Sequence, residues 1–122
     1  MTLLRRESAA DVDSLKANIQ KIWDAGLPVI DDLHTTALSW SPQEKKARLI
    51  ELLSELKPGI TEILFHASVE SEHFHLVTGT HASRQADTDA LTDPDVKKLI
   101  ASKGIITTTW RELKQRRARV KP

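Results

Sequence analysis

A histidine at the end of a strand-like segment is the residue of this chain whose position best suits chemistry. The run ITEILFHAS (60–68) is rich in large apolar side chains and predicts a buried strand over residues 61–67, which places His66 near its end. In α/β folds, ligands and catalytic groups collect at the carboxyl ends of parallel strands. An imidazole titrates near neutral pH, so His66 could serve there as a ligand or a general acid or base. The alternative is a histidine that caps the strand or bonds a loop carbonyl.

A second group of histidines follows in a polar stretch. His73 and His75 flank a phenylalanine, His81 comes six residues later, and Glu70 and Glu72 lie close by. Alternating residues of an extended segment face the same way, so two of these histidines could share a metal ion. The spacing matches no HExxH-type motif, and the alternative is a histidine-rich surface loop. We therefore assign no metal ligands from this stretch.

Three further residues could contact a polar or sugar substrate. Arg84 and Asp87 are three residues apart and could bind such a substrate or pair with each other. Trp110 could stack on a sugar ring, although core packing is the usual role of tryptophan. Asp31 and Asp32 close an apolar run and could bind a metal or orient a histidine, but ordinary turn and strand-end roles are at least as common for aspartate.

The elements that would position these residues alternate between helices and strands. Ser41, Pro42 and Glu44 resemble a capping-box start of one helix, and Asp93-Pro94 resembles the start of another. Strands are expected over 27–33, 61–67 and 105–110, helices over 8–26, 41–57, 93–104 and after 110, and an irregular loop over 69–91. This order predicts an α/β fold with a partial parallel sheet of three strands and right-handed crossovers.

The composition limits the class of protein. A chain of 122 residues with 39% hydrophobic and 29% charged residues predicts a single globular α/β domain over 1–122. Without cysteine it can form neither a disulfide nor a thiolate metal site, which is compatible with a cytoplasmic location. No apolar run approaches the roughly 20 residues of a membrane span, so no membrane partner is expected.

The positive charge is concentrated in the C-terminal segment, residues 111–122. This segment holds six basic residues against a single acidic residue, Glu112. It could form a solvated basic helix or tail, or it could bind anionic partners in a non-catalytic binding or assembly module. No aromatic residues interleave with these charges, so nucleic acid is not the expected partner.

Three segments in order resemble a known family. LKPGITEILFHAS (56–68), the RQAD stretch (84–87) and KGIITTTWREL (103–113) are similar to the C-terminal third of the YdjC-like carbohydrate deacetylases, and GLPVIDDL (26–33) resembles the segment before it. The resemblance implies a slice of a (β/α)-barrel-like fold and hydrolysis of the N-acetyl group of an amino sugar with a divalent metal, zinc or magnesium. It also matches His66 to a catalytic strand-end histidine, and it implies that Arg84 and Asp87 either face the substrate or order the loop.

Two departures from the family pattern qualify what the resemblance implies. Ala67 follows the histidine where the family has proline, so the turn after the strand differs. The paired aspartates and metal-binding histidines of the family's earlier strands have no match here, and Asp31-Asp32 is in the wrong segment to replace them. We therefore expect the C-terminal part of a deacetylase-like hydrolase that is incomplete or inactive alone. It would act on an N-acetylated sugar after self-association or together with an N-terminal portion.

Overall fold

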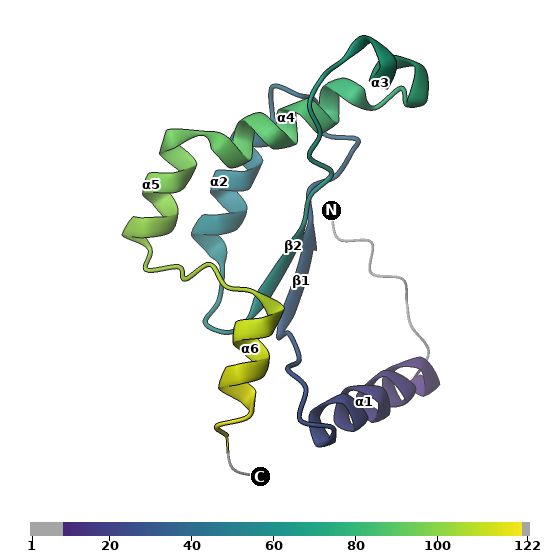
Figure 1. Cartoon of the computed structure of the whole chain (residues 1–122), viewed down its shortest axis with the longest axis vertical. Coiled ribbons are helices and arrows are strands. Elements are labelled where there is room, and N and C mark those ends of the chain that lie inside the picture. The colour runs from purple at the N-terminus through teal and green to yellow at the C-terminus, as the bar shows by residue number, and fades with distance from the viewer. Residues whose placement is uncertain (1–8, 121–122) are drawn as a thin grey trace. The chain divides into compact units, whose positions relative to one another are not determined.

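The computed structural model describes residues 9–120, which separate into two compact units (Figure 1). One unit spans Ile30–Thr107, and the other joins the residues up to Val29 with those from Thr108 onward. The elements in chain order are α1 (Ala9–Asp24), β1 (Asp32–Thr35), α2 (Lys45–Glu55), β2 (Thr61–Leu64), α3 (Glu72–Val77), α4 (His81–Thr92), α5 (Pro94–Ser102) and α6 (Trp110–Arg117).

The two strands of the unit 30–107 form a parallel pair, which confirms the α/β class and the parallel pairing. The register joins Asp32 to Thr61 at one end and Thr35 to Leu64 at the other. Just before the strands, the Asp31 carboxylate accepts a hydrogen bond from the Ile60 backbone N–H at 2.7 Å. Gly59 has a φ of +140°, and a Cβ there would lie 2.8 Å from that carboxylate. Glycine is therefore required at this turn, where the strand register is set.

Two predicted strands are in the wrong place or do not form. β1 begins at Asp32, so Asp31 and Asp32 lie at the start of the strand and not at its end. His66 lies near the other end of the strand pair, beyond the last residue of β2. The predicted strand over 105–110 pairs with no strand among residues 9–120, because Thr109 caps a helix that begins at Trp110. The Thr109 hydroxyl accepts from the Glu112 N–H, and the Glu112 carboxylate accepts from the Thr109 N–H.

The core of this unit lies on one face of the strand pair. Figure 1 shows α2, α4 and α5 grouped on one side of β1 and β2. Leu49, Leu53, Ala90 and Val96 from these helices form the buried cluster, and Ile63 and Phe65 pack against it. Side chains alternate along a strand, so Leu64 points to the opposite face, where it is 45% exposed and Leu33 is 54% exposed. The helices of this unit therefore leave the second face of the sheet open.

The stretch 69–91, expected to be an irregular loop, is largely helical. Ser71 begins α3, since its hydroxyl accepts a hydrogen bond from the Phe74 N–H. α4 follows after a turn of two threonines, and the small residues Ala86 and Ala90 form its buried face. Neither helix has the stripe of large apolar residues that identifies an amphipathic helix, and α3 has no buried residue at all.

The unit that contains α1 and α6 is held by aromatic and cationic contacts. The predicted helix end at Gly26 is confirmed: this residue has a φ of +75°, and the Leu27 N–H donates to the Ile22 carbonyl, as in a Schellman motif. The Arg117 guanidinium lies 3.7 Å from the centre of the Trp23 ring and donates to the Trp23 carbonyl. The predicted cap of α1, Ser8, lies outside the described residues.

The start of α2 differs in detail from the expected capping box. The helix begins at Lys45, and the Ser41 hydroxyl donates to the Glu44 carboxylate at 2.7 Å and so does not accept from the helix backbone. The Ser41 backbone N–H donates to the same carboxylate oxygen at 3.0 Å. These bonds from Ser41, with a smaller contribution from Arg48, lower the pKa of Glu44 from 4.5 to about 2.

The lowered pKa of Glu44 predicts a pH-dependent contribution to stability. A carboxylate whose pKa is lower in the folded state stabilises the fold above its unfolded value of 4.5, and this contribution is lost as the pH falls toward about 2. In Glu44→Gln, the stability deficit relative to the wild type should be largest above pH 4.5 and should shrink below it. Urea unfolding between pH 2.5 and 7 measures this difference. The exposed Glu51→Gln on the same helix is the control, and an equal pH trend in both variants would contradict the assignment.

Candidate functional site

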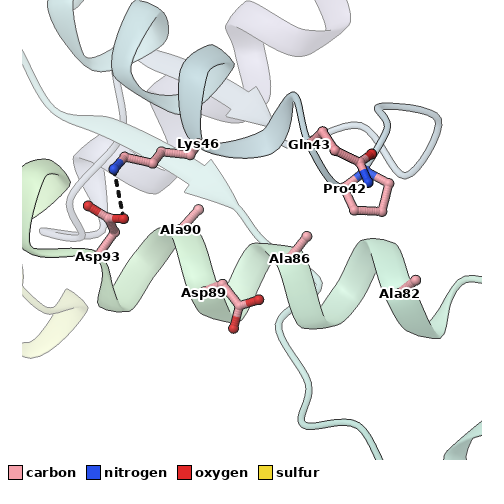
Figure 2. Close-up of a pocket in the computed structure, with 8 residues that line it drawn as sticks. All are labelled: Pro42, Gln43, Lys46, Ala82, Ala86, Asp89, Ala90 and Asp93. Atoms are coloured by element: carbon pink, nitrogen blue, oxygen red, sulfur yellow. Dashed lines mark ion pairs between the residues drawn. The ribbon is translucent and has the colours of Figure 1, made fainter.

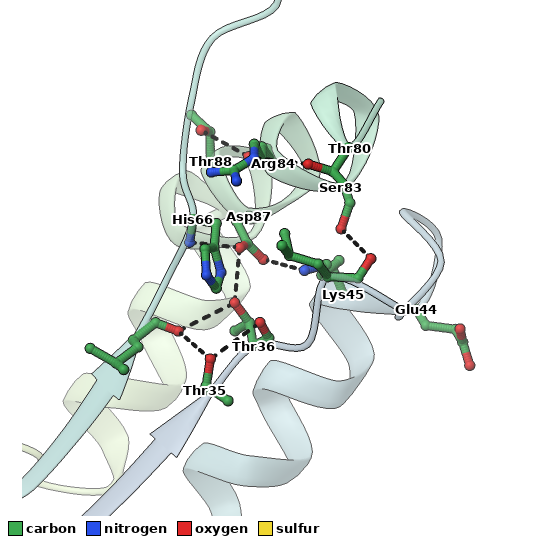
Figure 3. A network of polar contacts seen from close by, with 12 residues as sticks. Thr35, Thr36, Glu44, Lys45, His66, Thr80, Ser83, Arg84, Asp87 and Thr88 are labelled. Atoms are coloured by element: carbon green, nitrogen blue, oxygen red, sulfur yellow. Dashed lines mark hydrogen bonds and ion pairs between the residues drawn. The ribbon is translucent and has the colours of Figure 1, made fainter. Parts of the chain in front are cut away.

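A buried carboxylate lies at the carboxyl ends of the two strands. The Asp87 side chain, on α4, is 1% exposed and contacts three donors (Figure 3). The Lys45 Nζ lies 2.9 Å away, the Thr36 hydroxyl donates at 2.8 Å, and the His66 backbone N–H donates at 3.0 Å. Both Asp87 oxygens are thus turned toward cationic or N–H and O–H groups, as a buried carboxylate requires.

Each of these donors comes from a different element. Thr36 directly follows β1, His66 lies two residues beyond β2, and Lys45 is the first residue of α2. The Thr36 backbone N–H also donates to the Leu64 carbonyl at 3.0 Å, which continues the strand pairing past β1. Figure 3 shows these segments converging on Asp87 from the strand ends and from α2. The carboxylate therefore fixes the edge of the sheet where the candidate histidine lies.

The cation of this buried pair has a second neighbour. The Lys45 side chain is 1% exposed, like that of Asp87, and its Nζ lies 5.9 Å from the centre of the Trp40 ring. An aromatic face attracts a cation, most strongly where water is excluded. The 2.9 Å contact with Asp87 is a charge contact, because its angles are not those of a hydrogen bond. The loop residue Trp40 thus helps to hold Lys45 beside the sheet edge.

His66 is anchored by its backbone and leaves its ring nitrogen free for other partners. Its N–H donates to Asp87, while its Nδ1 is buried and has no hydrogen-bond partner among the described residues. The sequence analysis left open that the His66 ring bonds a loop carbonyl, and the Nδ1 atom makes no such bond. Buried polar atoms without a partner are rare in folded proteins, and they suit a site that binds a ligand or a water. The catalytic role of His66 stays a prediction.

Within the unit 30–107, the predicted substrate residues Arg84 and Asp87 have partners other than the His66 ring. The Arg84 Nε donates to the Thr80 hydroxyl at 3.0 Å, one turn earlier on α4, so Arg84 and Asp87 each pair with other residues. Trp110 is half-exposed at the start of α6, in the other unit. Asp87 is the one candidate that the structure brings to His66, through the backbone. Substrate binding by Arg84, Asp87 and Trp110 stays a prediction.

The histidine-rich stretch forms a cluster that the sequence did not identify correctly. His75 and His81 each contact one oxygen of the Glu70 carboxylate, and their rings stack with centres 3.8 Å apart. The sequence analysis instead expected histidines two residues apart to face the same way on an extended segment. This stretch forms the helix α3, and residues two apart on a helix point in different directions. The hydrogen bond from His81, followed by that from His75, lowers the pKa of Glu70.

A surface cleft of about 270 Å³ runs along α4 on the side toward the start of α2 (Figure 2). The three alanines at 82, 86 and 90 form much of its wall, together with Pro42 and Gln43. An ion pair between Lys46 and Asp93, 2.9 Å apart, lies at one end of the cleft. None of the predicted site residues lines this cleft, and we assign no chemistry to it.

The basic C-terminal segment is helical as far as Arg117. Arg117 packs on Trp23, whereas Arg111, Lys114 and Arg116 are exposed. Binding of an anionic partner by this segment stays a prediction. Among the described residues, no helix has both the length and the apolarity to cross a membrane.

Sequence comparison relates this chain to a curated enzyme. It is 31% identical over 103 residues to a carbohydrate deacetylase of Thermoanaerobacter pseudethanolicus, and the match covers 84% of this chain. The chain spans 41% of that relative's length. No family model matches the chain. No solved structure matches it either.

Removal of the buried carboxylate is expected to destabilise the fold strongly. Asp87→Ala leaves the buried Lys45 cation unpaired, which costs roughly 3–5 kcal/mol in comparable pairs. Asp89→Ala is the matched control on the same helix, since Asp89 is exposed and its change should stay within about 0.5 kcal/mol. Urea unfolding followed by circular dichroism measures both values. Similar losses in the two variants would show that Asp87 does not hold the sheet edge.

Proposed function

We propose that this chain forms part of an enzyme that removes the acetyl group of an N-acetylated amino sugar. The chain belongs to the carbohydrate deacetylase family, and it matches part of the length of a curated member. The similarity over 84% of the chain is the observation that carries this proposal. The arrangement at the sheet edge supports it, since the carboxyl ends of parallel strands are where α/β enzymes place catalytic groups.

The proposed role of His66 is that of a general acid. Hydrolysis of an amide releases an amine, and protonation of its nitrogen as the C–N bond breaks makes it a better leaving group. An imidazole is suited to hold and deliver that proton near neutral pH. Asp87 would act as a positioning residue, because it holds the His66 backbone and the ends of both strands in place. Arg84 and Trp110 are proposed to contact the sugar.

The family resemblance also implies a divalent metal ion. When bound, such an ion polarises the amide carbonyl and lowers the pKa of an attacking water. Among the described residues, a single group of three donors with ligand spacing is found, and His66 is not part of it. The residues around His66 therefore do not form a complete metal site, and we derive no catalytic step through the ion here.

The open face of the sheet is compatible with a partial catalytic unit. Parallel strands are normally covered on both faces, yet Leu33 and Leu64 are about half-exposed on the face opposite the core. We propose that further α/β structure of the enzyme, in a barrel-like arrangement, covers this face. That structure would come from another portion of the protein or from a second copy, and it would supply the metal ligands.

The chain alone is expected to release no acetate. The test incubates the 122-residue chain with N-acetylated chitooligosaccharides and either Zn²⁺ or Mg²⁺, and measures acetate. No release above the protein-free blank is expected, because His66 belongs to no group of possible metal ligands within residues 9–120. Release that disappears in His66→Ala would contradict the proposed incompleteness and would still support the activity.

A chimera tests the activity itself. The segment of the Thermoanaerobacter enzyme that matches this chain is replaced by the corresponding residues of this chain. We expect acetate release by the chimera, and a loss of roughly 100-fold or more in kcat with His66→Ala, the range of general acid catalysis. His34→Ala is the matched control and should retain the rate. A folded chimera that binds the oligosaccharide but releases no acetate would contradict the proposed function.

A further inference from the structure

Three side chains outside the strand edge bring their ligand atoms together. One carboxylate oxygen of Glu70, one ring nitrogen of His75 and one ring nitrogen of His81 all lie within 4.8 Å of one another. The His81 Nδ1 is 2.8 Å from Glu70 Oε1, and the His75 Nε2 contacts Glu70 Oε2. The two rings stack with 19° between their planes, and one nitrogen of each ring contacts the same carboxylate.

The donor set is one that zinc prefers. Two imidazole nitrogens and one carboxylate oxygen make up the three protein ligands of many zinc sites, and a water takes the fourth position. Around a tetrahedral ion with bonds near 2.1 Å, ligand atoms lie roughly 3.4 Å apart. The present contacts are somewhat shorter than this, because the carboxylate now accepts from the ring N–H groups directly. To admit the ion, the 2.8 Å contact of His81 would lengthen by about 0.6 Å and that of His75 by more, which partly exposed side chains can do by turning.

The backbone around Glu70 is fixed to α4. The Glu70 N–H donates to the Gln85 side-chain oxygen at 2.7 Å. Two residues earlier, Ser68 donates its N–H to the Arg84 carbonyl and accepts from the Thr88 hydroxyl. His81 is the first residue of that same helix α4. The Glu70 backbone is thus tied to the helix that begins with His81 before any ion arrives, which reduces the entropy lost on binding.

The remaining ligand comes from α3, and the cluster is open to solvent. The Ser71 cap orders α3, which carries His75 at its fourth residue. The side chains of Glu70, His75 and His81 are 34%, 51% and 29% exposed, so an ion can reach all three and each can adjust. Figure 1 shows α3 at one end of α4. His75 lies on α3, His81 is the first residue of α4, and Glu70 lies just before α3.

We infer that Glu70, His75 and His81 bind one divalent transition-metal ion of the zinc type. The alternative, in which the two histidines only hydrogen-bond to Glu70 on the surface, uses the same contacts without an ion. The two differ in whether the chain binds Zn²⁺ with defined stoichiometry and through these three side chains. This difference can be measured without any enzymatic activity.

Calorimetric titration of the 122-residue chain with ZnCl₂ tests the inference. One ion per chain is expected, with a rise in the unfolding temperature, because a ligand that binds only the folded state stabilises it. His75→Ala, His81→Ala and Glu70→Gln should each weaken binding at least about tenfold, since even indirect partners of a metal ligand commonly contribute that much. Co²⁺ in place of Zn²⁺ should give visible absorption that the same variants lose.

His73→Ala and His34→Ala are the controls. His73 lies on α3 two residues before His75, outside the three-residue cluster. His34 lies on β1, where it pairs with Asp32. Both variants should bind Zn²⁺ like the wild type. The inference is overturned if the wild type binds no ion, if His75→Ala or His81→Ala binds as tightly as the wild type, or if the control variants lose affinity equally. Circular dichroism of each variant separates loss of a ligand from loss of the fold.

Discussion

The pairing of Lys45 with Asp87 is the interaction on which the sheet edge depends. Two fully buried opposite charges can persist only when each has partners that replace water, and here those partners come from four elements. Asp87 receives the Thr36 hydroxyl and the His66 backbone N–H in addition to the lysine. Because a half-satisfied buried charge is costly, the ends of both strands, the first turn of α2 and the middle of α4 must come together in one arrangement.

The same buried ion pair bears on the predicted role of Asp87 in substrate binding. Asp87 was a candidate for binding a polar substrate, and in the structure its oxygens contact Lys45, Thr36 and His66. It lies beside the proposed general acid through the backbone of that residue, whose ring nitrogen has no partner among the described residues. An arrangement of this kind lets the fold position a reactive side chain rigidly while its reactive atom is left for another group.

Local signals in the sequence predicted what they encode directly. Asp93-Pro94 and Gly104 correctly bracketed α5. The apolar run after Gly59 correctly gave the start of β2, but the strand ends at Leu64 and not at residue 67, so His66 lies beyond it. The missed features depend on contacts between distant segments: Asp87 meets Thr36 from 51 residues away, and a strand at 105–110 would require a neighbour. The helix expected after residue 110 is confirmed as α6, and the Thr109-to-Glu112 capping box could have fixed its first residue, whereas α3 lacks the large apolar stripe that marks a helix.

The histidine cluster was missed for a related reason. Its members were all noted in the sequence, but their pairing depends on whether the stretch is extended or helical. Once α3 and α4 form, His75 and His81 meet at Glu70, and His73 is not part of this group. A prediction of metal ligands from spacing therefore needs the secondary structure first, since each geometry selects a different pair of residues.

The hydrogen bond from the His66 backbone to Asp87 has a consequence for how the protein opens. An amide proton exchanges with solvent deuterium only after its hydrogen bond breaks and water reaches it. The acceptor here is a carboxylate that cannot leave its partners without exposing an ion pair, so local fraying of the strand end is suppressed. The rate of hydrogen–deuterium exchange at the His66 amide therefore measures how often the buried charges of Lys45 and Asp87 separate.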